Sequence, residues 1–164
     1  MSRLLPLAAL LVILLIAFFT WRVLFPGDEA KIRKVLDAVA RAASVTPNEG
    51  SLGRLTKAAK LASLCTANVE IRVDALGMRG GLDGRDEVRS AAMNLGNSFG
   101  TYRIITGEVQ IRDLSADQAR VTLTARFEGS RPADINAQEF ELRFKKVEGR
   151  WLIQRVQTLQ ALRR

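Results

Sequence analysis

The chain has 164 residues, a formal net charge of +8, a single cysteine and no histidine. The lack of histidine excludes histidine acid–base catalysis, histidine-activated nucleophiles and the usual metal sites built from histidine. Cys65 cannot form a disulfide bond within the chain, and we interpret it as a small buried apolar residue. The length suits one domain with one hydrophobic core.

The first element is an apolar stretch at residues 4–25, from Leu4 to Phe25, which carries no charge before Arg22. A helix of this length is about 33 Å long and spans a bilayer. Pro26 comes next and ends the helix. The pattern predicts an N-terminal transmembrane anchor at residues 1–26 and a separate folded domain at residues 27–164.

Two alternatives concern this anchor. A cleaved signal peptide is disfavoured because bulky residues such as Phe19 and Trp21 stand where cleavage requires small ones. The basic residues after the span favour a cytoplasmic domain, whereas short N-terminal anchors commonly export the domain attached to them. We expect a single-pass membrane protein whose domain lies on the exported side, the periplasmic side of a bacterial inner membrane.

The domain is expected to begin with two helices, separated by the turn TPNEG at residues 46–50. Asp28 is predicted to start the first helix, and Ser51 to cap the second, which runs to about Leu64. Apolar residues recur at helical spacing on one face of the first helix: Ile32, Val35, Leu36, Val39 and Ala43.

Residues 68–74 then alternate between apolar and charged side chains, which predicts a strand with one buried face. Four glycines come after it, Gly77, Gly80, Gly81 and Gly84, and predict a flexible turn region. A third helix is expected to open at Asp83 or Gly84. Its apolar stripe consists of Val88, Ala91, Ala92, Leu95 and Phe99.

The remainder of the chain predicts strands. Residues 102–112 and 119–128 flank a short polar turn and should form an antiparallel hairpin. Residues 140–145 and 151–159 should form a second hairpin. This order of elements predicts an α+β fold, with three helices packed on a curved, mainly antiparallel sheet.

Three stretches carry a resemblance to a known family: ANVE at residues 67–70, GRDEV at residues 84–88 and EGRWLIQRV at residues 148–156. In order and spacing the chain resembles the nuclear transport factor 2-like superfamily, with its ketosteroid isomerase and SnoaL-like polyketide cyclase relatives. The resemblance implies a cystatin-like α+β cone with a pocket between helices and sheet. The superfamily uses that pocket for isomerases, dehydratases, ligand binding and protein docking, so the fold does not settle the function.

The residues that carry catalysis in the isomerases of this family do not transfer to this chain. Their general base is an Asp directly after a Val-Glu pair, but here Ile71 stands after Val69 and Glu70. The one tyrosine, Tyr102, lies at the start of a later strand, and Phe140 stands in the region where a second acid is expected. We therefore assign no catalytic residue, no cofactor and no metal site from the sequence.

The sequence favours a membrane-anchored binding or scaffold module that docks a partner protein or a small apolar ligand without catalysis. A homodimer through the sheet fits the same interpretation. One alternative is an isomerase- or cyclase-type enzyme with displaced catalytic groups, for which Glu70, Asp74 and Glu108 are the candidate carboxylates. Another is a basic domain that binds an anionic lipid surface. Nucleic acid is disfavoured because the basic residues are scattered and not interleaved with aromatic residues.

Five residues are candidates for lining the pocket: Tyr102, Glu108, Arg126, Phe140 and Trp151. Their spacing leaves open whether Glu108 and Arg126 face the interior of the cone or the outer face of the sheet. Trp151 alternates with Ile153 and therefore also fits a core position.

Overall fold

The structure is a computed structural model that describes residues 27–75, 78–129 and 136–159. The predicted anchor at residues 1–26 lies outside these ranges. Within them, no helix is long and apolar enough to cross a membrane. The chain divides into two units between Arg33 and Lys34, and the unit of residues 34–164 contains the sheet.

The three predicted helices are confirmed. They are α2 (Asp28–Ala43), α3 (Ser51–Ser63) and α4 (Arg85–Phe99). Gly84 is the N-cap of α4 and has a φ of 91°, a backbone conformation that favours glycine, so the glycine fixes where this helix begins. At α3 the expected cap is shifted by one residue, because Gly50 is the N-cap and Ser51 is already helical.

The strands are β1 (Cys65–Ala75), β2 (Met78–Asp83), β3 (Tyr102–Arg112), β4 (Gln118–Gly129), β5 (Asn136–Val147) and β6 (Arg150–Thr158). These six strands form one sheet in the order β2-β1-β6-β5-β4-β3. Both predicted hairpins are confirmed, since β3 pairs antiparallel with β4, and β5 pairs antiparallel with β6. The first strand runs parallel to the last, so the sheet is mixed.

The region predicted as a flexible glycine turn contains strand β2, so that prediction is wrong. Gly80 pairs with Val73, and Gly81 pairs with Arg72 on the neighbouring strand. Glycine has a low intrinsic preference for strands, but here the hydrogen-bond ladder to β1 outweighs it. The Arg72 side chain lies over Gly81 and reaches Asp83, where its guanidinium nitrogen is 2.7 Å from the carboxylate.

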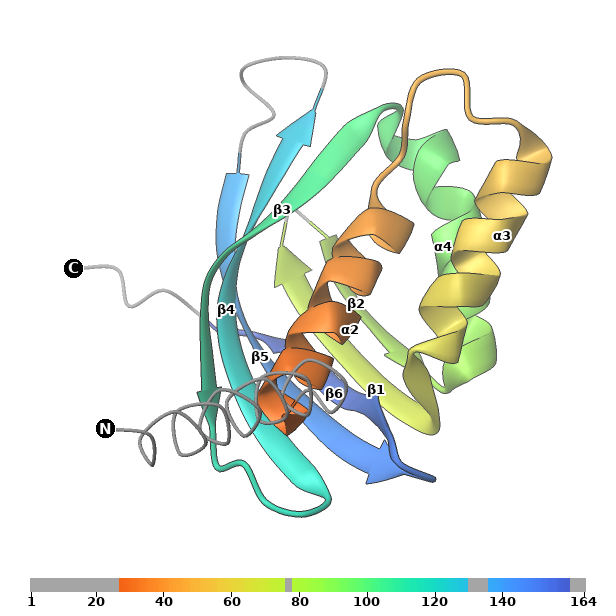
Figure 1. Cartoon of the computed structure of the whole chain (residues 1–164). Coiled ribbons are helices and arrows are strands. Elements are labelled where there is room, and N and C mark those ends of the chain that lie inside the picture. The colour runs from red at the N-terminus through yellow and green to blue at the C-terminus, as the bar shows by residue number, and fades with distance from the viewer. Residues whose placement is uncertain (1–26, 76–77, 130–135, 160–164) are drawn as a thin grey trace, which may run out of the picture. The chain divides into compact units, whose positions relative to one another are not determined.

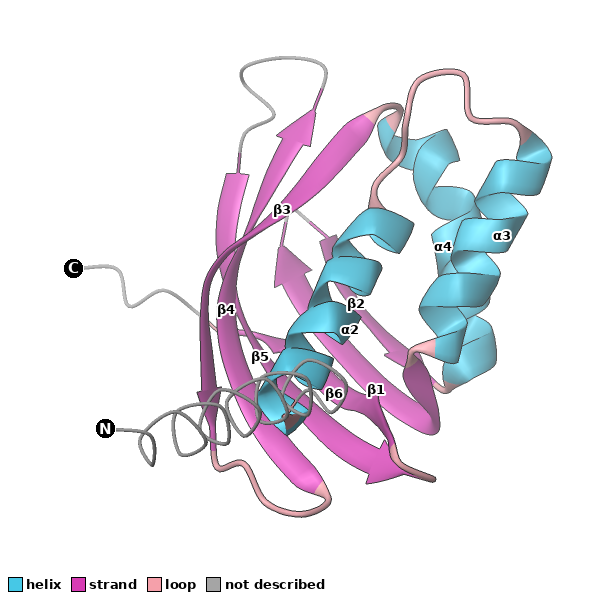
Figure 2. Ribbon diagram, in the orientation of Figure 1, coloured by secondary structure: helices cyan, strands magenta, loops and turns pink. Residues whose placement is uncertain are grey.

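In the unit of residues 34–164, α3, α4 and the part of α2 from Lys34 onward lie on the same side of the curved sheet (Figures 1 and 2). Strand β4 shows how the sheet contributes to the core. Val121, Leu123 and Ala125 alternate along it and are buried, whereas Arg120 and Arg126 are exposed. The sheet therefore presents one apolar face to the helices and one polar face to solvent.

Candidate ligand-binding cavity

A cavity of about 430 Å³ lies between the helices and the sheet, within residues 34–164. This volume falls in the range of roughly 300–1,000 Å³ that is usual for small-molecule sites. All three helices and all six strands contribute to its wall. The lining residues are Leu36, Val39, Ala40, Ala43, Leu61, Cys65, Ile71, Val73, Gly80, Gly81, Leu82, Val88, Ala91, Ala92, Ile104, Thr106, Leu123, Ala125, Phe127, Phe140, Leu142, Ile153 and Val156.

Small side chains leave this space unfilled. Protein interiors are normally packed about as densely as organic crystals, so facing alanines leave a void where larger residues would meet. Here alanines face the cavity from α2, α4 and β4, and an added Cβ at Gly80 would find no atom within 4 Å. The lining alanines are Ala40, Ala43, Ala91, Ala92 and Ala125.

The wall of the cavity is apolar. Among the lining residues, Thr106 has the one hydroxyl group and Cys65 has the one ionisable group, a thiol. Every other lining residue is aliphatic, aromatic or glycine. The cavity therefore offers a ligand dispersion contacts and the burial of apolar surface, which yields about 25 cal/mol per Å² of apolar area.

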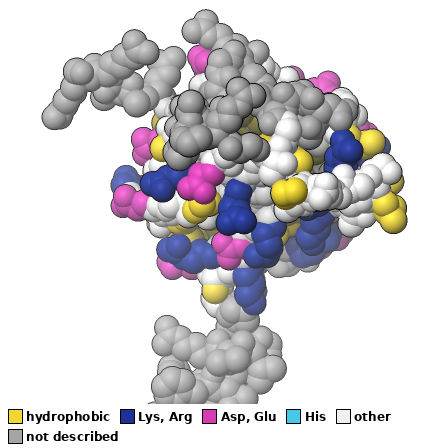
Figure 3. Space-filling view, turned by 90° about the horizontal axis from the view of Figure 1, so that it is seen from above, with side chains coloured by type: hydrophobic (Ala, Val, Ile, Leu, Met, Phe, Trp, Pro, Cys, Tyr) yellow, Lys and Arg dark blue, Asp and Glu magenta, His cyan; other side chains and the backbone are white. Residues whose placement is uncertain are grey.

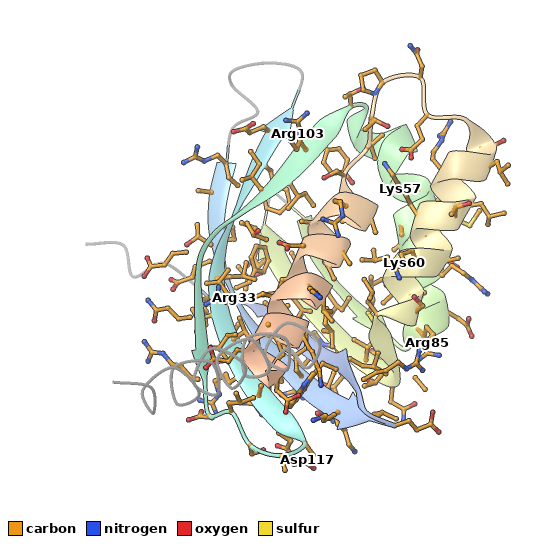
Figure 4. The ribbon with its side chains drawn as sticks, in the orientation of Figure 1. Arg33, Lys57, Lys60, Arg85, Arg103 and Asp117 are labelled. Carbon is orange, nitrogen blue, oxygen red and sulfur yellow. The ribbon has the colours of Figure 1, made fainter. Side chains whose placement is uncertain are left out.

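Cys65 is held as a neutral thiol at the start of β1. Its side chain is buried, and its Sγ donates a weak hydrogen bond to the carbonyl oxygen of Leu61 at 3.5 Å. Burial raises the pKa of this thiol to about 11, and the nearby Arg85 partly opposes the shift. Arg85 lies at the first turn of α4 and donates two hydrogen bonds to the Cys65 carbonyl oxygen, at 2.6 and 3.2 Å (Figure 4). Since the thiolate is the reactive form, Cys65 is a poor nucleophile at neutral pH.

Of the five predicted pocket residues, Phe140 lines the cavity. Its ring packs edge-on against that of Phe127, with ring centroids 6.3 Å apart and an angle of 64° between the ring planes. Phe127 also lines the cavity, so this aromatic pair forms part of its wall on β4 and β5. Such pairs add about 0.5–1.5 kcal/mol beyond the area that they bury.

Tyr102 lies beside a second, smaller hollow of about 290 Å³. Residues of the α2–α3 connection line this hollow together with the ends of β3 and β4. Val45 and Tyr102 form a β-bridge there, with hydrogen bonds of 2.9 and 3.1 Å between their backbones. Burial raises the pKa of Tyr102 to about 12, and the nearby carboxylate of Glu49 also acts to raise it. Tyr102 thus lies where the α2–α3 connection pairs with the edge strand β3.

Glu108, Arg126 and Trp151 do not line either hollow. Glu108 is exposed and accepts a hydrogen bond of 2.7 Å from the side chain of Gln110. Arg126 is exposed on β4, 4.0 Å from the Glu128 carboxylate. Trp151 is buried at the start of β6, and the Lys146 ammonium lies 5.4 Å from the centroid of its ring.

The other two candidate carboxylates belong to the outer face of the sheet. Glu70 accepts a charged hydrogen bond from Arg155, and the backbone N–H of Asp74 donates to the Thr158 hydroxyl at 3.0 Å. Both acids alternate along β1 with Ile71 and Val73, whose side chains line the cavity. Successive side chains of a strand point to opposite faces, so these carboxylates point away from the cavity.

Charged side chains lie on the surface of the domain, where cations and anions are interspersed (Figure 3). Lys57 extends from α3 to Glu49 at 2.8 Å and donates to the Ser44 carbonyl oxygen at 2.9 Å, while Arg103 lies near the start of β3 (Figure 4). In the described ranges, no cluster of three or more His, Cys, Asp or Glu residues could hold a metal ion.

Thr106 was not among the residues predicted to line the pocket. It faces the cavity from β3 at a β-bulge, where the pairing with β4 shifts between Thr106 and Val109. The extra residue of a bulge breaks the simple alternation of a strand, so the facing of side chains cannot be counted from the sequence. Gly107 in the stretch ITGEV was the one available sign of an irregular strand.

The sequence matches no protein-family model and no curated protein. Solved structures do share the fold. An NTF2-like protein with a cystatin-like fold from Novosphingobium aromaticivorans is 16% identical, with a TM-score of 0.61 over 96% of this chain and 90% of its own. A domain of unknown function with a cystatin-like fold from Nostoc punctiforme is 14% identical, with a TM-score of 0.65 over 85% of this chain and 80% of its own.

A third similar structure carries the name of an enzyme. It is a protein provisionally named scytalone dehydratase, from Novosphingobium aromaticivorans, at 16% identity and a TM-score of 0.61. The alignment covers 81% of this chain and 85% of that protein. At such identities the likeness concerns the fold and not the activity. The chain has the α+β fold of NTF2-like, cystatin-like proteins, with three helices on a curved, mixed sheet.

Proposed function

We propose that this protein is a membrane-tethered binding module that takes a small apolar ligand into the cavity between its helices and its sheet, without transforming it. The observation that carries the proposal is the chemistry of the cavity wall. A volume of about 430 Å³ is lined by side chains of which one bears a hydroxyl and none bears a carboxylate, an ammonium or a guanidinium group.

The same wall argues against acid–base chemistry as the role of this cavity. Isomerases of this type need a base beside a carbonyl group and a donor that stabilises the resulting oxyanion. Glu70 and Asp74 point to the outer face of the sheet, Glu108 is exposed, and the Cys65 thiol, with its raised pKa, remains protonated at neutral pH. No step of proton transfer can be assigned to the described residues of the wall.

An apolar wall also sets the class of ligand. A carboxylate or ammonium group inside the cavity would lose its hydration without gaining a charged partner, which costs several kcal/mol. A neutral apolar body has no such cost, and each buried methylene group contributes about 0.8 kcal/mol. The tether, formed by the predicted anchor at residues 1–26, keeps the module at a membrane, where apolar compounds are concentrated.

A substitution that fills the cavity tests the proposal. The full chain, held in phosphatidylcholine nanodiscs, is titrated with the neutral fluorophore phenylnaphthylamine, and the signal of empty nanodiscs is subtracted. Ala92→Leu places a larger side chain at the wall, and we expect it to weaken binding about tenfold or more because the ligand loses buried methylene-sized contacts.

Ala59→Leu is the matched control. It makes the same change on an exposed helical position that does not line the cavity, so we expect binding within about twofold of the unchanged protein. Equal binding by both variants would overturn the proposal.

A further inference from the structure

One hydroxyl group faces the apolar cavity, and it belongs to Thr106. No hydrogen bond joins its hydroxyl to another residue in the part of the chain that the structure describes. The Cys65 thiol, the other polar group of the wall, already donates to the Leu61 carbonyl oxygen. Thr106 is therefore the side chain of the wall whose hydrogen-bonding capacity is left for a ligand.

The local backbone directs Thr106 to the cavity. Thr106 pairs with Ala125, and Val109 pairs with Leu123. Between these two pairs β3 advances by three residues and β4 by two, so β3 has one extra residue. The extra residue forms a bulge, a feature that re-aims side chains and that is frequent beside functional sites. At Gly107 an added Cβ would lie 3.3 Å from the Thr124 carbonyl oxygen, so the backbone of the bulge packs closely against β4.

The residue across from Thr106 is small. Ala125, its partner on β4, covers little of the neighbouring side chain, and Ile104 lies two residues earlier on the same strand and also lines the cavity. Threonine favours strands because it is β-branched, but valine would do so equally well and would match the apolar wall. Strand preference therefore explains a β-branched residue at position 106, but it does not explain the hydroxyl group.

We propose that Thr106 determines ligand specificity, and that the cavity selects a neutral, largely apolar molecule carrying one hydroxyl or carbonyl oxygen, which hydrogen-bonds to the Thr106 hydroxyl. This inference rests on the proposed function, since it names the chemical class of ligand for the same cavity. The single donor and acceptor group fixes the orientation of the ligand, and the apolar wall supplies most of the affinity.

A matched pair of ligands and a matched pair of variants test this inference. Naphthol and naphthalene differ by one hydroxyl, and each is titrated in competition with phenylnaphthylamine on the full chain in nanodiscs. Thr106→Val keeps the shape and removes the hydroxyl, so we expect naphthol to bind about threefold to tenfold more weakly, with naphthalene within about twofold. Thr106→Ser retains the hydroxyl and should keep the preference for naphthol.

Thr122→Val is the control, because Thr122 pairs with Gln110 and Glu141 and does not line the cavity. It should leave the binding of both ligands unchanged. Equal affinity of naphthol for the unchanged protein and for Thr106→Val, while phenylnaphthylamine still binds, would overturn the role of Thr106 alone. If the unchanged protein binds neither naphthalene nor phenylnaphthylamine above empty nanodiscs, the proposed function itself fails.

Discussion

The environment of Cys65 links one buried residue to the chemistry of the whole cavity. Its thiol lines an apolar wall, and burial raises its pKa so that it stays protonated well above neutral pH. Arg85, whose charge acts to lower this pKa, donates two hydrogen bonds to the Cys65 carbonyl oxygen. A guanidinium beside a thiol can lower its pKa, but here desolvation is the larger effect. Cys65 therefore serves packing, as its sequence context predicted.

The raised pKa of Cys65 predicts a loss of stability at alkaline pH. The thiol of the unfolded chain releases its proton near pH 9, whereas the folded chain holds it until about pH 11. Below pH 9 the thiol is protonated in both states, and the free energy of unfolding keeps its full value. As the pH rises from 9 to 11 the unfolded state is favoured by loss of the proton, so the free energy of unfolding falls by about 2 to 3 kcal/mol. Urea unfolding at several pH values should show this decline.

Cys65→Ala is the control for that decline. Tyr102, whose pKa is raised to about 12, also titrates in this range and is left intact in the variant. The difference between the unchanged protein and Cys65→Ala therefore isolates the thiol. The same slope of unfolding free energy against pH in both proteins would show that Cys65 is not desolvated in the folded chain.

At the scale of elements, strand β2 shows how a glycine-rich segment can complete a sheet. Gly80 and Gly81 are adjacent but meet different surroundings. Gly80 pairs with Val73, which lines the cavity, so the two residues face the same side of the sheet. An added Cβ at Gly80 would therefore enter open space on the cavity side. An added Cβ at Gly81 would lie 2.9 Å from a guanidinium nitrogen of Arg72 on the other side. The two glycines thus separate the effects of filling the cavity from those of changing the strand.

Gly80→Val should raise the free energy of unfolding by about 0.4–1 kcal/mol, because it reduces the freedom of the unfolded chain at a position with room for the side chain. It should also weaken the binding of phenylnaphthylamine, because the new side chain occupies part of the cavity. Chemical denaturation and fluorescence titration measure the two effects.

Gly81→Val is the companion variant. The backbone of Gly81 lines the cavity, but the added side chain points to the opposite face of the strand, so the cavity keeps its volume. There it displaces the flexible end of Arg72 and disturbs a surface ion pair with Asp83, which is worth about 0–1 kcal/mol. Binding should therefore stay as it is in the unchanged protein. Equal loss of binding in both variants would mean that strand geometry, and not cavity volume, controls the affinity.

Local patterns in the sequence predict most of the elements. Helical spacing of apolar residues located α2 and α4, and alternation located β4 and both hairpins, because these signals arise within a few residues of each other. Strand β2 was missed because its glycines carry no such signal and its pairing with β1 decides its conformation. Phe140 is the predicted residue that lines the cavity, whereas the cavity itself depends on residues brought together from nine elements, which no local pattern reports.

At the scale of the whole molecule, the proposed function joins a predicted anchor to a described cavity. The anchor at residues 4–25 remains a prediction from hydropathy and length. We expect the full chain to stay in the membrane fraction after extraction with alkaline carbonate, and a variant lacking residues 1–26 to be recovered in the aqueous fraction. Full-length chain in the aqueous extract, or a mature chain without its start, would contradict the tether.

The parallel pairing of β1 with β6 has a consequence for how the protein is made. Glu70 and Arg155 meet across this pair, although they are 85 residues apart in the chain. The hairpin of β1 and β2 is joined to the four other strands through this one seam. The ribosome must therefore synthesise β6 before the two parts of the sheet can pair. Closing so large a loop slows folding and leaves the edges of β1 and of the other part of the sheet unpaired, and thus prone to aggregation, until β6 has been made.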